Sequence, residues 1–547
     1  MFFDDKITSK QLIWIIGIGL IIVLFGWNNV LELRAEEPRR AVVSMEMAFF
    51  NNYIIPKISG WSYYNKPPVF NWVMVLFFKL FNSFEEWVVR MPSLISLLIL
   101  AFANYKIVQQ WLSKKIAILS SLFFLTSADI LFYGTVNSGE IDLFYSTLVY
   151  LQIMSLFVFW EKRNYLFLFL GAYFFAAVGF LTKGIPSIAF QALSLLALIV
   201  YSKEWKWLFR WQHFFGLLVF LIIVVGYFYT YAQEEDVTGF LVRQFKEASQ
   251  RTGLETKFLD TAIQFFTFPF LLGKLIIPWV LFLPLLFLKK VRQVVWENKL
   301  LRFAIIFCIT NLPIYWFSGD FRSRYMYMFL PCLCIIIAAI FEKNAKEYKY
   351  YTILEKLFIG ITIVIPIAAV TAVFLPQTQH LPNMLMKSIF VFVVGGSIAY
   401  AYVKSEKNKV YYFILSIVCA RLLFNFAYLP ALQEQSQALT YRDEMKKIAA
   451  VTNNEQVFLY GKVHEFKSDA SIGLLKFKEV ELTTAPLIAY QIPYYLMKYT
   501  QKPLVFHEKM QRGNYYILPK AMQENEVPIF QFKDKWLQKE MVLIKAK

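Results

Sequence analysis

The sequence predicts an α-helical polytopic membrane protein with about 13 transmembrane helices, followed by a small C-terminal α/β domain outside the membrane. Three observations predict this class. Of the 547 residues, 58% are hydrophobic and only 17% are charged, whereas soluble domains are roughly 45–50% apolar and about 25% charged. The apolar residues gather in runs of about 17–20, the length that a helix needs to cross a bilayer. Lysine and arginine gather in every second connection between these runs, as in the cytoplasmic loops of membrane proteins.

Residues 1–430 make up the predicted transmembrane domain, and residues 431–547 the predicted extracytoplasmic domain. We interpret the first apolar run as an anchor, because it is long for a signal peptide and no small-residue cleavage site follows it directly. Residues 68–82 are apolar but short, and Lys79 interrupts them, so we expect a helix at the outer interface. The expected spans are 11–29, 91–108, 115–133, 142–160, 164–181, 185–201, 213–231, 269–288, 302–317, 326–341, 354–375, 385–402 and 410–430.

The charge pattern also predicts the orientation. The short connections 134–141 and 376–384 carry no lysine or arginine, whereas the alternate connections carry several. The positive-inside rule therefore places the N-terminus in the cytoplasm, and the odd number of spans places the C-terminus outside. If the source is bacterial, the membrane is the inner or plasma membrane.

This topology accounts for most of the net charge of +18. We expect no nucleic-acid partner, because no basic face with interleaved aromatic residues occurs on a soluble module. The four cysteines all lie inside apolar runs, which predicts neither a disulfide framework nor a zinc site.

The expected outer connections contain the residues that could carry chemistry. A carboxylate can take a proton from an attacking hydroxyl or amine. Arginine and lysine can bind a phosphate and stabilise its charge as it leaves. Together these groups fit a displacement at a carbon whose leaving group is a phosphate. The candidates are Glu36, Glu37, Arg39, Lys66, Asp142, Lys183, Arg251, Arg324 and Tyr325.

Each candidate has a purely structural alternative. Acids beside a helix end, such as Glu36 and Glu37, are often only solvated. Lys183 could cap a helix C-terminus, and Arg251 could be an ordinary solvated loop residue. The outer face restricts the donor, because nucleotide sugars and ATP are cytosolic. The chain also has no G-x-x-x-x-G-K-[ST] loop. A membrane lipid that carries a sugar on a phosphate would satisfy these constraints.

At these residues the chain resembles the GT-C membrane glycosyltransferases. The similarity is greatest to the group of protein O-mannosyltransferases and aminoarabinose (lipid A) transferases, and it covers about residues 10–430. The matching motifs are Glu36-Glu37-Pro38-Arg39, Tyr63-Tyr64-Asn65-Lys66-Pro67-Pro68, Arg90-Met91-Pro92-Ser93, Asp142, Leu181-Thr182-Lys183-Gly184, Pro278-Trp279, and Arg324-Tyr325 with Pro331.

The resemblance implies a polyprenyl-phosphate sugar donor, transfer on the outer side of the membrane and inversion at the anomeric carbon. It implies that Glu36 is the base or the group that orients the acceptor. Because the family usually has aspartate first, the roles of Glu36 and Glu37 could be exchanged. The acceptor stays open among protein, glycan and lipid. Asp142 would shape the acceptor side or hold cationic partners. The phosphate ligands that it implies are Arg39, Lys66, Arg251 and Tyr325, and we expect Lys183 and Arg324 to bind the phosphate as well.

Two departures from the group limit what the resemblance implies. The aminoarabinose transferases have a glutamate before the K-P-P lysine, where this chain has Asn65. They also have an E-H-x-x-R run in the long outer loop, where this chain has Glu247-Ala248-Ser249-Gln250-Arg251. We therefore expect no tightly bound cofactor or metal, although a divalent metal stays open. The same differences weaken lipid A as the acceptor.

The C-terminal domain is predicted from short β-rich runs between helical segments. It would either cover the catalytic face, receive the acceptor or act as a structural cap. Strands are expected at 456–461, 503–507, 514–518 and 541–545, and helices at 438–450 and 486–499.

Two other function classes stay open. A lipid or glycolipid transporter or flippase would show paired half-repeats and charges near the bilayer midplane. No internal repeat is seen, and most charges lie at one face. A non-catalytic membrane assembly subunit would tolerate loss of the acidic pair and of Lys66. The partners expected for the transferase are therefore the lipid-linked donor, its acceptor and membrane lipids.

Overall fold

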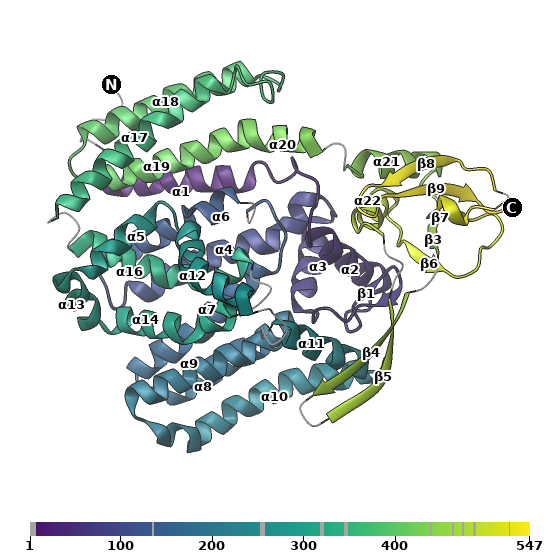
Figure 1. Ribbon diagram of the computed structural model, residues 1–547, viewed down its shortest axis with the longest axis horizontal. Helices are drawn as coiled ribbons and strands as arrows, with labels where there is room; N and C mark the ends of the chain where they lie inside the picture. The colour runs from purple at the N-terminus through teal and green to yellow at the C-terminus, as the bar shows by residue number, and fades with distance from the viewer. Residues whose placement is uncertain are drawn as a thin grey trace.

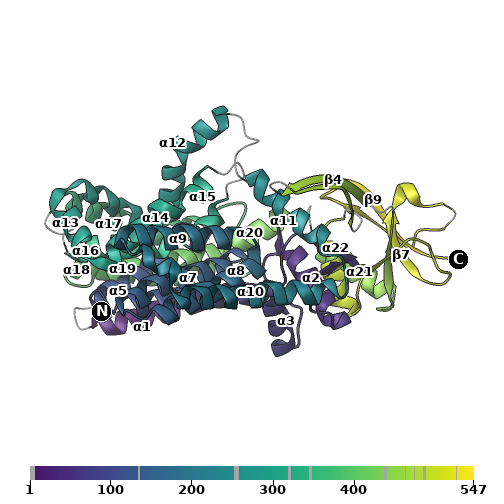
Figure 2. The same cartoon turned by 90° about the horizontal axis from the view of Figure 1, so that it is seen from below.

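The protein consists of a helical body and a β-rich C-terminal part, which lie at opposite ends of an elongated molecule (Figures 1 and 2). The computed structural model describes residues 7–133, 136–251, 258–317, 322–343, 348–436, 440–461, 464–472, 475–484, 488–524 and 526–547. Side chains are described in these ranges except within 245–251, 258–261 and 464–484.

Within the described residues, eight helices are long and apolar enough to cross a membrane. They are α4 (Glu86–Val108), α7 (Asp142–Glu161), α8 (Tyr165–Lys183), α10 (Trp211–Ala232), α14 with α15 (Lys299–Asn311 and Pro313–Trp316), α17 (Lys349–Thr371), α18 (Met384–Lys404), and α19 with η5 and α20 (Lys409–Leu423, Phe424–Tyr428 and Leu429–Gln435). Four shorter apolar helices are α1 (Ser9–Phe25), α3 (Val69–Phe81), α9 (Pro186–Ser202) and Ala262–Leu275 of α12 (Phe258–Leu275). The chain is thus a multi-pass membrane protein with a single helical body.

The prediction of about 13 uniform spans differs from this arrangement, because some expected spans are broken. Residues 115–133 form α5 (Lys114–Leu125) and α6 (Ala128–Phe132). At this break the hydroxyls of Thr126 and Ser127 donate to the carbonyls four residues earlier, which is a common cause of helix bending. Residues 269–288 contain the end of α12 and the 3-10 helix η2 (Trp279–Phe287). Pro278 lies between them and has no N–H to continue the helix.

Large apolar side chains on the outside of the helical body have no protein neighbours to cover them. Ile222 of α10, Ile367 of α17 and Phe390 of α18 are more than half exposed. Exposed apolar side chains on helices long enough to cross a membrane indicate contact with lipid. By contrast, α7 is one of the most enclosed helices, so its N-terminal Asp142 lies in the interior of the molecule.

Short elements at the junction of the two parts surround the candidate site. They are α2 (Glu37–Phe50), the hairpin strands β1 (Lys57–Ile58) and β2 (Trp61–Ser62), α11 (Thr238–Arg251) and η3 (Ser323–Met326). Figure 1 shows α2, α3 and β1 between the helical body and the C-terminal sheet. The apolar segment predicted at 68–82 forms α3. The remaining helices of the body are η1 (Trp205–Phe209), α13 (Lys289–Glu297) and α16 (Leu330–Lys343).

The C-terminal part contains a five-stranded sheet in the order β6-β3-β7-β9-β8. Strand β3 is parallel to β6 and β7, and β9 is antiparallel to β7 and β8. Strands lie at all four positions where the sequence predicts them, whereas β8 and the hairpin β4–β5 were not predicted. The elements are α21 (Arg442–Val451), β3 (Val457–Tyr460), β4 (His464–Ile472), β5 (Leu475–Thr484), α22 (Gln491–Thr500), β6 (Val505–His507), β7 (Tyr515–Pro519), η7 (Lys520–Met522), β8 (Phe530–Asp534) and β9 (Lys539–Lys545).

The hairpin β4–β5 extends away from this sheet toward α11 (Figures 1 and 2). The last helix of the body, α20, continues to Gln435. The domain boundary at 430/431 stays a prediction.

Candidate functional site

A cavity of about 340 Å³ lies where α2, the 63–68 segment, α7, α11 and η3 meet. Among the described residues, seven cationic and three carboxylate side chains line it. The lining residues are Glu36, Arg39, Arg40, Asn65, Lys66, Glu140, Ile141, Asp142, Lys183, Arg243, Arg322, Arg324 and Tyr325. Such an excess of clustered cations favours a ligand with a phosphate or another multiply charged anion.

The acidic pair lies at the start of α2, and its two members face different surroundings. Pro38 favours helix initiation here, because its fixed φ suits the first turn. Consecutive helical residues point about 100° apart. Glu36 lines the cavity, forms an ion pair with Arg39 and has a side chain that is 33% exposed. Glu36 is therefore accessible to a ligand in the cavity.

Glu37 points into the protein interior and is fully buried. Its carboxylate accepts hydrogen bonds from Arg90 Nε at 2.9 Å, the Arg34 backbone N–H at 2.9 Å and the Gly139 backbone N–H at 2.5 Å. A second bond from Arg90 Nη2 at 3.1 Å makes the pair bidentate. Glu37 does not line the cavity, and it joins α2, α4 and the connection before α7.

A second cluster forms around Asp142, the first residue of α7. Its carboxylate lies 2.5 Å from Lys183 Nζ at the end of α8 and 3.1 Å from Arg324 Nε. Arg324 also contacts Glu140, with 2.5 Å between Nη1 and Oε1. Lys183 Nζ lies 4.1 Å from the ring centroid of Tyr325, a cation–π arrangement. The structure thus brings the candidate residues Asp142, Lys183, Arg324 and Tyr325 together, with Glu140 beside them.

Glu140 lies in the connection before α7, where its surroundings disfavour the ionised form. Burial and the neighbouring Asp142 carboxylate raise the pKa of Glu140 to about 7, and Arg324 opposes this effect. Two carboxylates that share one cation cannot both ionise at low cost. The net charge of the cavity therefore changes near neutral pH.

Aromatic rings lie beside the two arginines of α2. The guanidinium of Arg39 lies 5.8 Å from the ring centroids of both Tyr63 and Tyr490. The guanidinium of Arg40 lies 5.6 Å from the Tyr63 ring. Lys66 is 7% exposed and reaches the same cavity. The predicted Arg39 and Lys66 are therefore brought together with Glu36.

Helix α11 is fastened to the segment that carries Lys66. Gln244 Nε2 donates to the carbonyls of Asn65 at 3.0 Å and Tyr64 at 3.4 Å, and Arg243 Nε donates to Asn65 Oδ1 at 3.3 Å. The predicted Arg251 ends α11, and its side chain lies outside the described residues. Its assignment to the phosphate stays a prediction.

Besides Ile141, five polar lining residues were not among the predicted site residues. Arg40 follows Arg39, and Arg322 precedes Arg324 by two positions. Their closeness in the sequence to predicted residues is the feature that could have predicted them. Glu140 and Asn65 adjoin predicted residues in the same way. The five are Arg40, Asn65, Glu140, Arg243 and Arg322.

Within the parts of the chain that the structure describes, no three His, Cys, Asp or Glu side chains lie close enough to hold a metal ion. The expectation that no metal is tightly bound stays a prediction.

Comparisons with known proteins bear on the whole chain. A protein-family model described as dolichyl-phosphate-mannose-protein mannosyltransferase matches residues 65–229. The undecaprenyl phosphate-alpha-4-amino-4-deoxy-L-arabinose arabinosyl transferase of Shewanella sediminis is 24% identical over 418 residues, covering 74% of this chain and 73% of the relative. The transferase of the same name from Serratia proteamaculans is 22% identical over 418 residues, covering 71% and 70% of the two chains.

A solved structure shares the fold over nearly its full length. The crystal structure of ArnT from Cupriavidus metallidurans bound to undecaprenyl phosphate matches with a TM-score of 0.71 and 15% sequence identity, and the match covers 98% of each chain. The apo crystal structure of that protein matches with a TM-score of 0.67 and 16% identity. Both the helical body and the C-terminal sheet therefore belong to the shared fold.

Proposed function

We propose that the chain is a membrane glycosyltransferase of the GT-C type that transfers a 4-amino-4-deoxy-L-arabinose-type pentose from undecaprenyl phosphate to a lipid A-type acceptor on the outer face of the membrane. The relatives' names supply the sugar and its carrier lipid. The lipid A-type acceptor is our inference from the similarity to aminoarabinose transferases, which extends over 74% of this chain and outweighs the departures at Asn65 and in the run Glu247–Arg251. The orientation is our inference from the charge of the connections.

One observation carries this proposal: the cavity combines a cationic excess with one accessible carboxylate, Glu36. The cations suit the phosphate that links a sugar to its carrier lipid. The carboxylate suits an acceptor hydroxyl that must lose a proton as it attacks.

We derive the transfer step from these groups. The acceptor oxygen attacks the anomeric carbon while Glu36 takes the proton of the acceptor hydroxyl. The bond from the anomeric carbon to the phosphate oxygen breaks, and the phosphate keeps the electron pair. Arg39 and Lys66 stabilise the charge on the departing lipid phosphate. A single displacement of this kind inverts the anomeric centre.

The remaining charged groups have supporting parts in this scheme. Asp142 holds Lys183 and Arg324 on the wall of the cavity. Glu37 anchors α2, because all of its described contacts lie within the protein interior. The scheme therefore assigns the base to Glu36 rather than Glu37.

The proposal is tested with purified protein in liposomes that contain undecaprenyl-phosphate-linked 4-amino-4-deoxy-L-arabinose and lipid A. Mass spectrometry should show an acceptor heavier by one aminopentose, with release of undecaprenyl phosphate. Glu36→Gln should lower kcat by about 100-fold or more, which is typical for loss of a general base. The matched control is Glu406→Gln, which changes an exposed glutamate between α18 and α19.

Two results would contradict the proposal. Full turnover by Glu36→Gln would remove the assigned base. Transfer only to a protein or glycan acceptor would retain the enzyme class and overturn the lipid acceptor, whereas donor hydrolysis alone would overturn the transferase assignment as well.

A further inference from the structure

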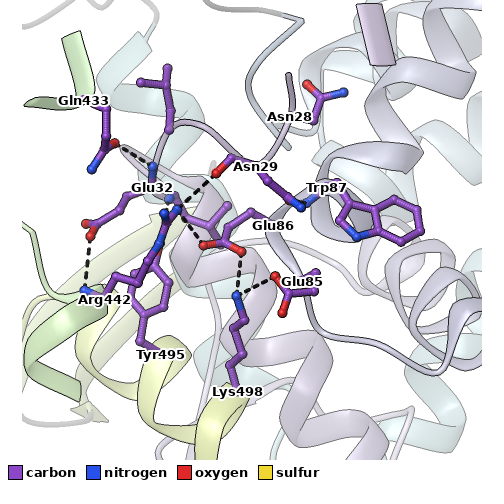
Figure 3. A network of polar contacts seen from close by, with 12 residues as sticks. Asn28, Asn29, Glu32, Glu85, Glu86, Trp87, Gln433, Arg442, Tyr495 and Lys498 are labelled. Carbon is purple, nitrogen blue, oxygen red and sulfur yellow. Dashed lines mark hydrogen bonds and ion pairs between the residues drawn. The ribbon is translucent and has the colours of Figure 1, made fainter. Parts of the chain in front are cut away.

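The C-terminal part forms hydrogen bonds with the chain segment that leads to Glu36. In Figure 3, residues of α20, α21 and α22 surround Glu32 and Glu86. Glu32 lies four residues before Glu36, and its carboxylate accepts the backbone N–H groups of Arg442 at 3.1 Å and Tyr441 at 3.3 Å. The next backbone N–H, that of Leu33, donates to the Tyr495 hydroxyl at 3.2 Å.

A buried carboxylate at the start of α4 makes the second part of this contact. Glu86 has a side chain that is 2% exposed and lies between two cations of the C-terminal part. Lys498 Nζ is 2.7 Å from Glu86 Oε2, and Arg442 Nη2 is 2.8 Å from Glu86 Oε1. A carboxylate this deeply buried requires such partners, because an uncompensated charge there is costly.

Helix α4 also contacts the acidic pair Glu36–Glu37, through Arg90. Arg90 follows Glu86 by four residues on α4, so both side chains lie on one face of the helix. Arg90 forms the bidentate pair with Glu37 and also donates to the carbonyls of Leu31 at 3.0 Å and Glu32 at 3.1 Å. Glu37 is covalently adjacent to Glu36. A continuous set of polar contacts thus joins α22 to the start of α2.

A separate contact reaches the cavity directly. Tyr490, at the start of α22, lies near Arg39, with its ring centroid 5.8 Å from the guanidinium, the same distance as that of Tyr63. Arg39 in turn forms the ion pair with Glu36. The C-terminal part therefore contacts Arg39, which lines the cavity, as well as the segment that precedes α2.

We propose that Glu86, together with Lys498 and Arg442, is a positioning residue for the transfer reaction, and that the C-terminal domain acts as part of the catalytic apparatus by fixing the geometry of Glu36. The inference rests on the proposed role of Glu36 as the base. It goes beyond a covering or acceptor-binding role for the domain, because the contacts described here stabilise the start of α2 and α4.

Such positioning is needed because proton transfer requires the base to be placed accurately relative to the reacting atoms. Displacements of about 1 Å can cost as much as 100-fold in rate, even when the changed residue is remote from the reacting atoms. Segment 28–36 has no regular helix or strand apart from turns. Its backbone donors and carbonyls are instead held by Glu37, Arg90, Tyr495 and Gln433.

The test compares Lys498→Met, Lys498→Arg and Glu86→Gln with Glu85→Gln in the full-length protein. Glu85 is a matched control, because it contacts the same Lys498 Nζ at 2.7 Å but has a side chain that is 45% exposed. We expect Lys498→Met and Glu86→Gln to lower kcat by about 10- to 100-fold, with KM for undecaprenyl-phosphate-linked sugar changed less than threefold. Lys498→Arg should recover most of kcat, and Glu85→Gln should retain it.

The readouts separate positioning from simple loss of folding. Rates are normalised to the folded fraction measured by size exclusion and thermal unfolding, and the pH profile of kcat is recorded. If these residues position Glu36, the acidic side of the pH profile of kcat should shift in the variants relative to the wild type, while the folded fraction stays unchanged. If Glu86→Gln does not fold, Tyr495→Phe tests the same segment through its bond to Leu33. Unchanged normalised kcat in Lys498→Met would overturn the inference, while loss of turnover in Glu36→Gln would still support the proposed function.

Discussion

At the scale of single residues, neighbours in the sequence have different surroundings and hence different parts in the scheme. Glu36 and Glu37 are adjacent, yet only Glu36 lines the cavity. The Glu37 carboxylate is buried and accepts hydrogen bonds from Arg90, Arg34 and Gly139. The motif that predicted the pair could not assign the two positions. Their difference depends on the direction of each side chain at the start of α2 and on partners from distant segments.

Removal of Glu37 should destabilise the fold. Glu37→Ala leaves Arg90, which is fully buried, without its carboxylate partner. Breaking a buried ion pair in this way costs about 3–5 kcal/mol. We expect a lower free energy of unfolding, measured by thermal or denaturant unfolding in detergent. Glu36→Gln is the control and should unfold like the wild type.

A double substitution checks that the charge pair is the cause. Glu37→Leu with Arg90→Met removes both charges, and replacing a buried ion pair by apolar groups of similar size is often close to neutral. The double variant should therefore be more stable than Glu37→Ala. Equal loss of stability in both would point to packing rather than to the ion pair.

The charge of Glu140 should make donor binding depend on pH. Because its pKa is raised from 4.5 to about 7, Glu140 is mostly neutral below pH 7 and becomes negative above it. Ionisation reduces the cationic excess that attracts the donor phosphate, so KM for the donor should rise by several-fold between pH 6 and pH 8. Steady-state kinetics across this range measures the effect.

Glu140→Gln keeps a neutral hydrogen-bonding group at this position and should retain a low KM at pH 8. The wild-type protein at pH 6 is the reference state. A KM that rises equally in Glu140→Gln would assign the pH dependence to another group.

At the scale of elements, hydropathy predicted which segments are apolar but not where their helices break. The segment 115–133 reads as one span, yet the hydroxyls of Thr126 and Ser127 bond back to carbonyls of α5 and a new helix follows. Their effect depends on local backbone geometry, which average hydropathy does not report. The β4–β5 hairpin was missed for a similar reason, because its residues are mostly polar and their pairing is a tertiary property.

Helix α11 shows how an element can support the site through a backbone contact. Gly184 has φ of +85°, a conformation that residues with a Cβ rarely adopt. A Cβ at this position would collide with the Gln244 side chain, which holds the carbonyls of Tyr64 and Asn65 beside Lys66. Close packing of Gly184 and Gln244 is therefore required to hold α11 against the segment that carries Lys66.

Substitutions at this contact should weaken donor binding. Gln244→Ala removes the hydrogen bonds to the 63–68 segment, and a hydrogen bond contributes about 1 kcal/mol, so KM for the donor should rise by roughly fivefold with kcat nearly unchanged. Gly184→Ala should have the same or a larger effect. Gln233→Ala, which changes an exposed side chain at the end of α10, is the kinetic control. An unchanged KM in both variants would show that α11 is not needed to place Lys66.

At the scale of the whole molecule, the positions of charged groups connect topology with chemistry. The described residues contain a helical body with lipid-facing apolar surface and a C-terminal sheet beyond the end that carries the cavity (Figure 2). If that end faces outward, the cationic connections at the other end face the cytoplasm, as the positive-inside rule requires. The reaction would then occur where lipid-linked sugars are consumed rather than where nucleotide sugars are available.

Cysteine labelling can determine this orientation, because the four native cysteines are buried and should give little background. Arg512→Cys places a thiol on the exposed surface of the C-terminal domain, and Lys114→Cys places one in a cationic connection. In sealed right-side-out vesicles, a membrane-impermeant maleimide should label Arg512→Cys at once and Lys114→Cys only after permeabilisation. The reverse pattern would place Glu36 and the cavity on the cytoplasmic side and contradict transfer at the outer face. Labelling of both sites before permeabilisation would show that the vesicles leak, and wild-type protein measures the reactivity of the buried thiols.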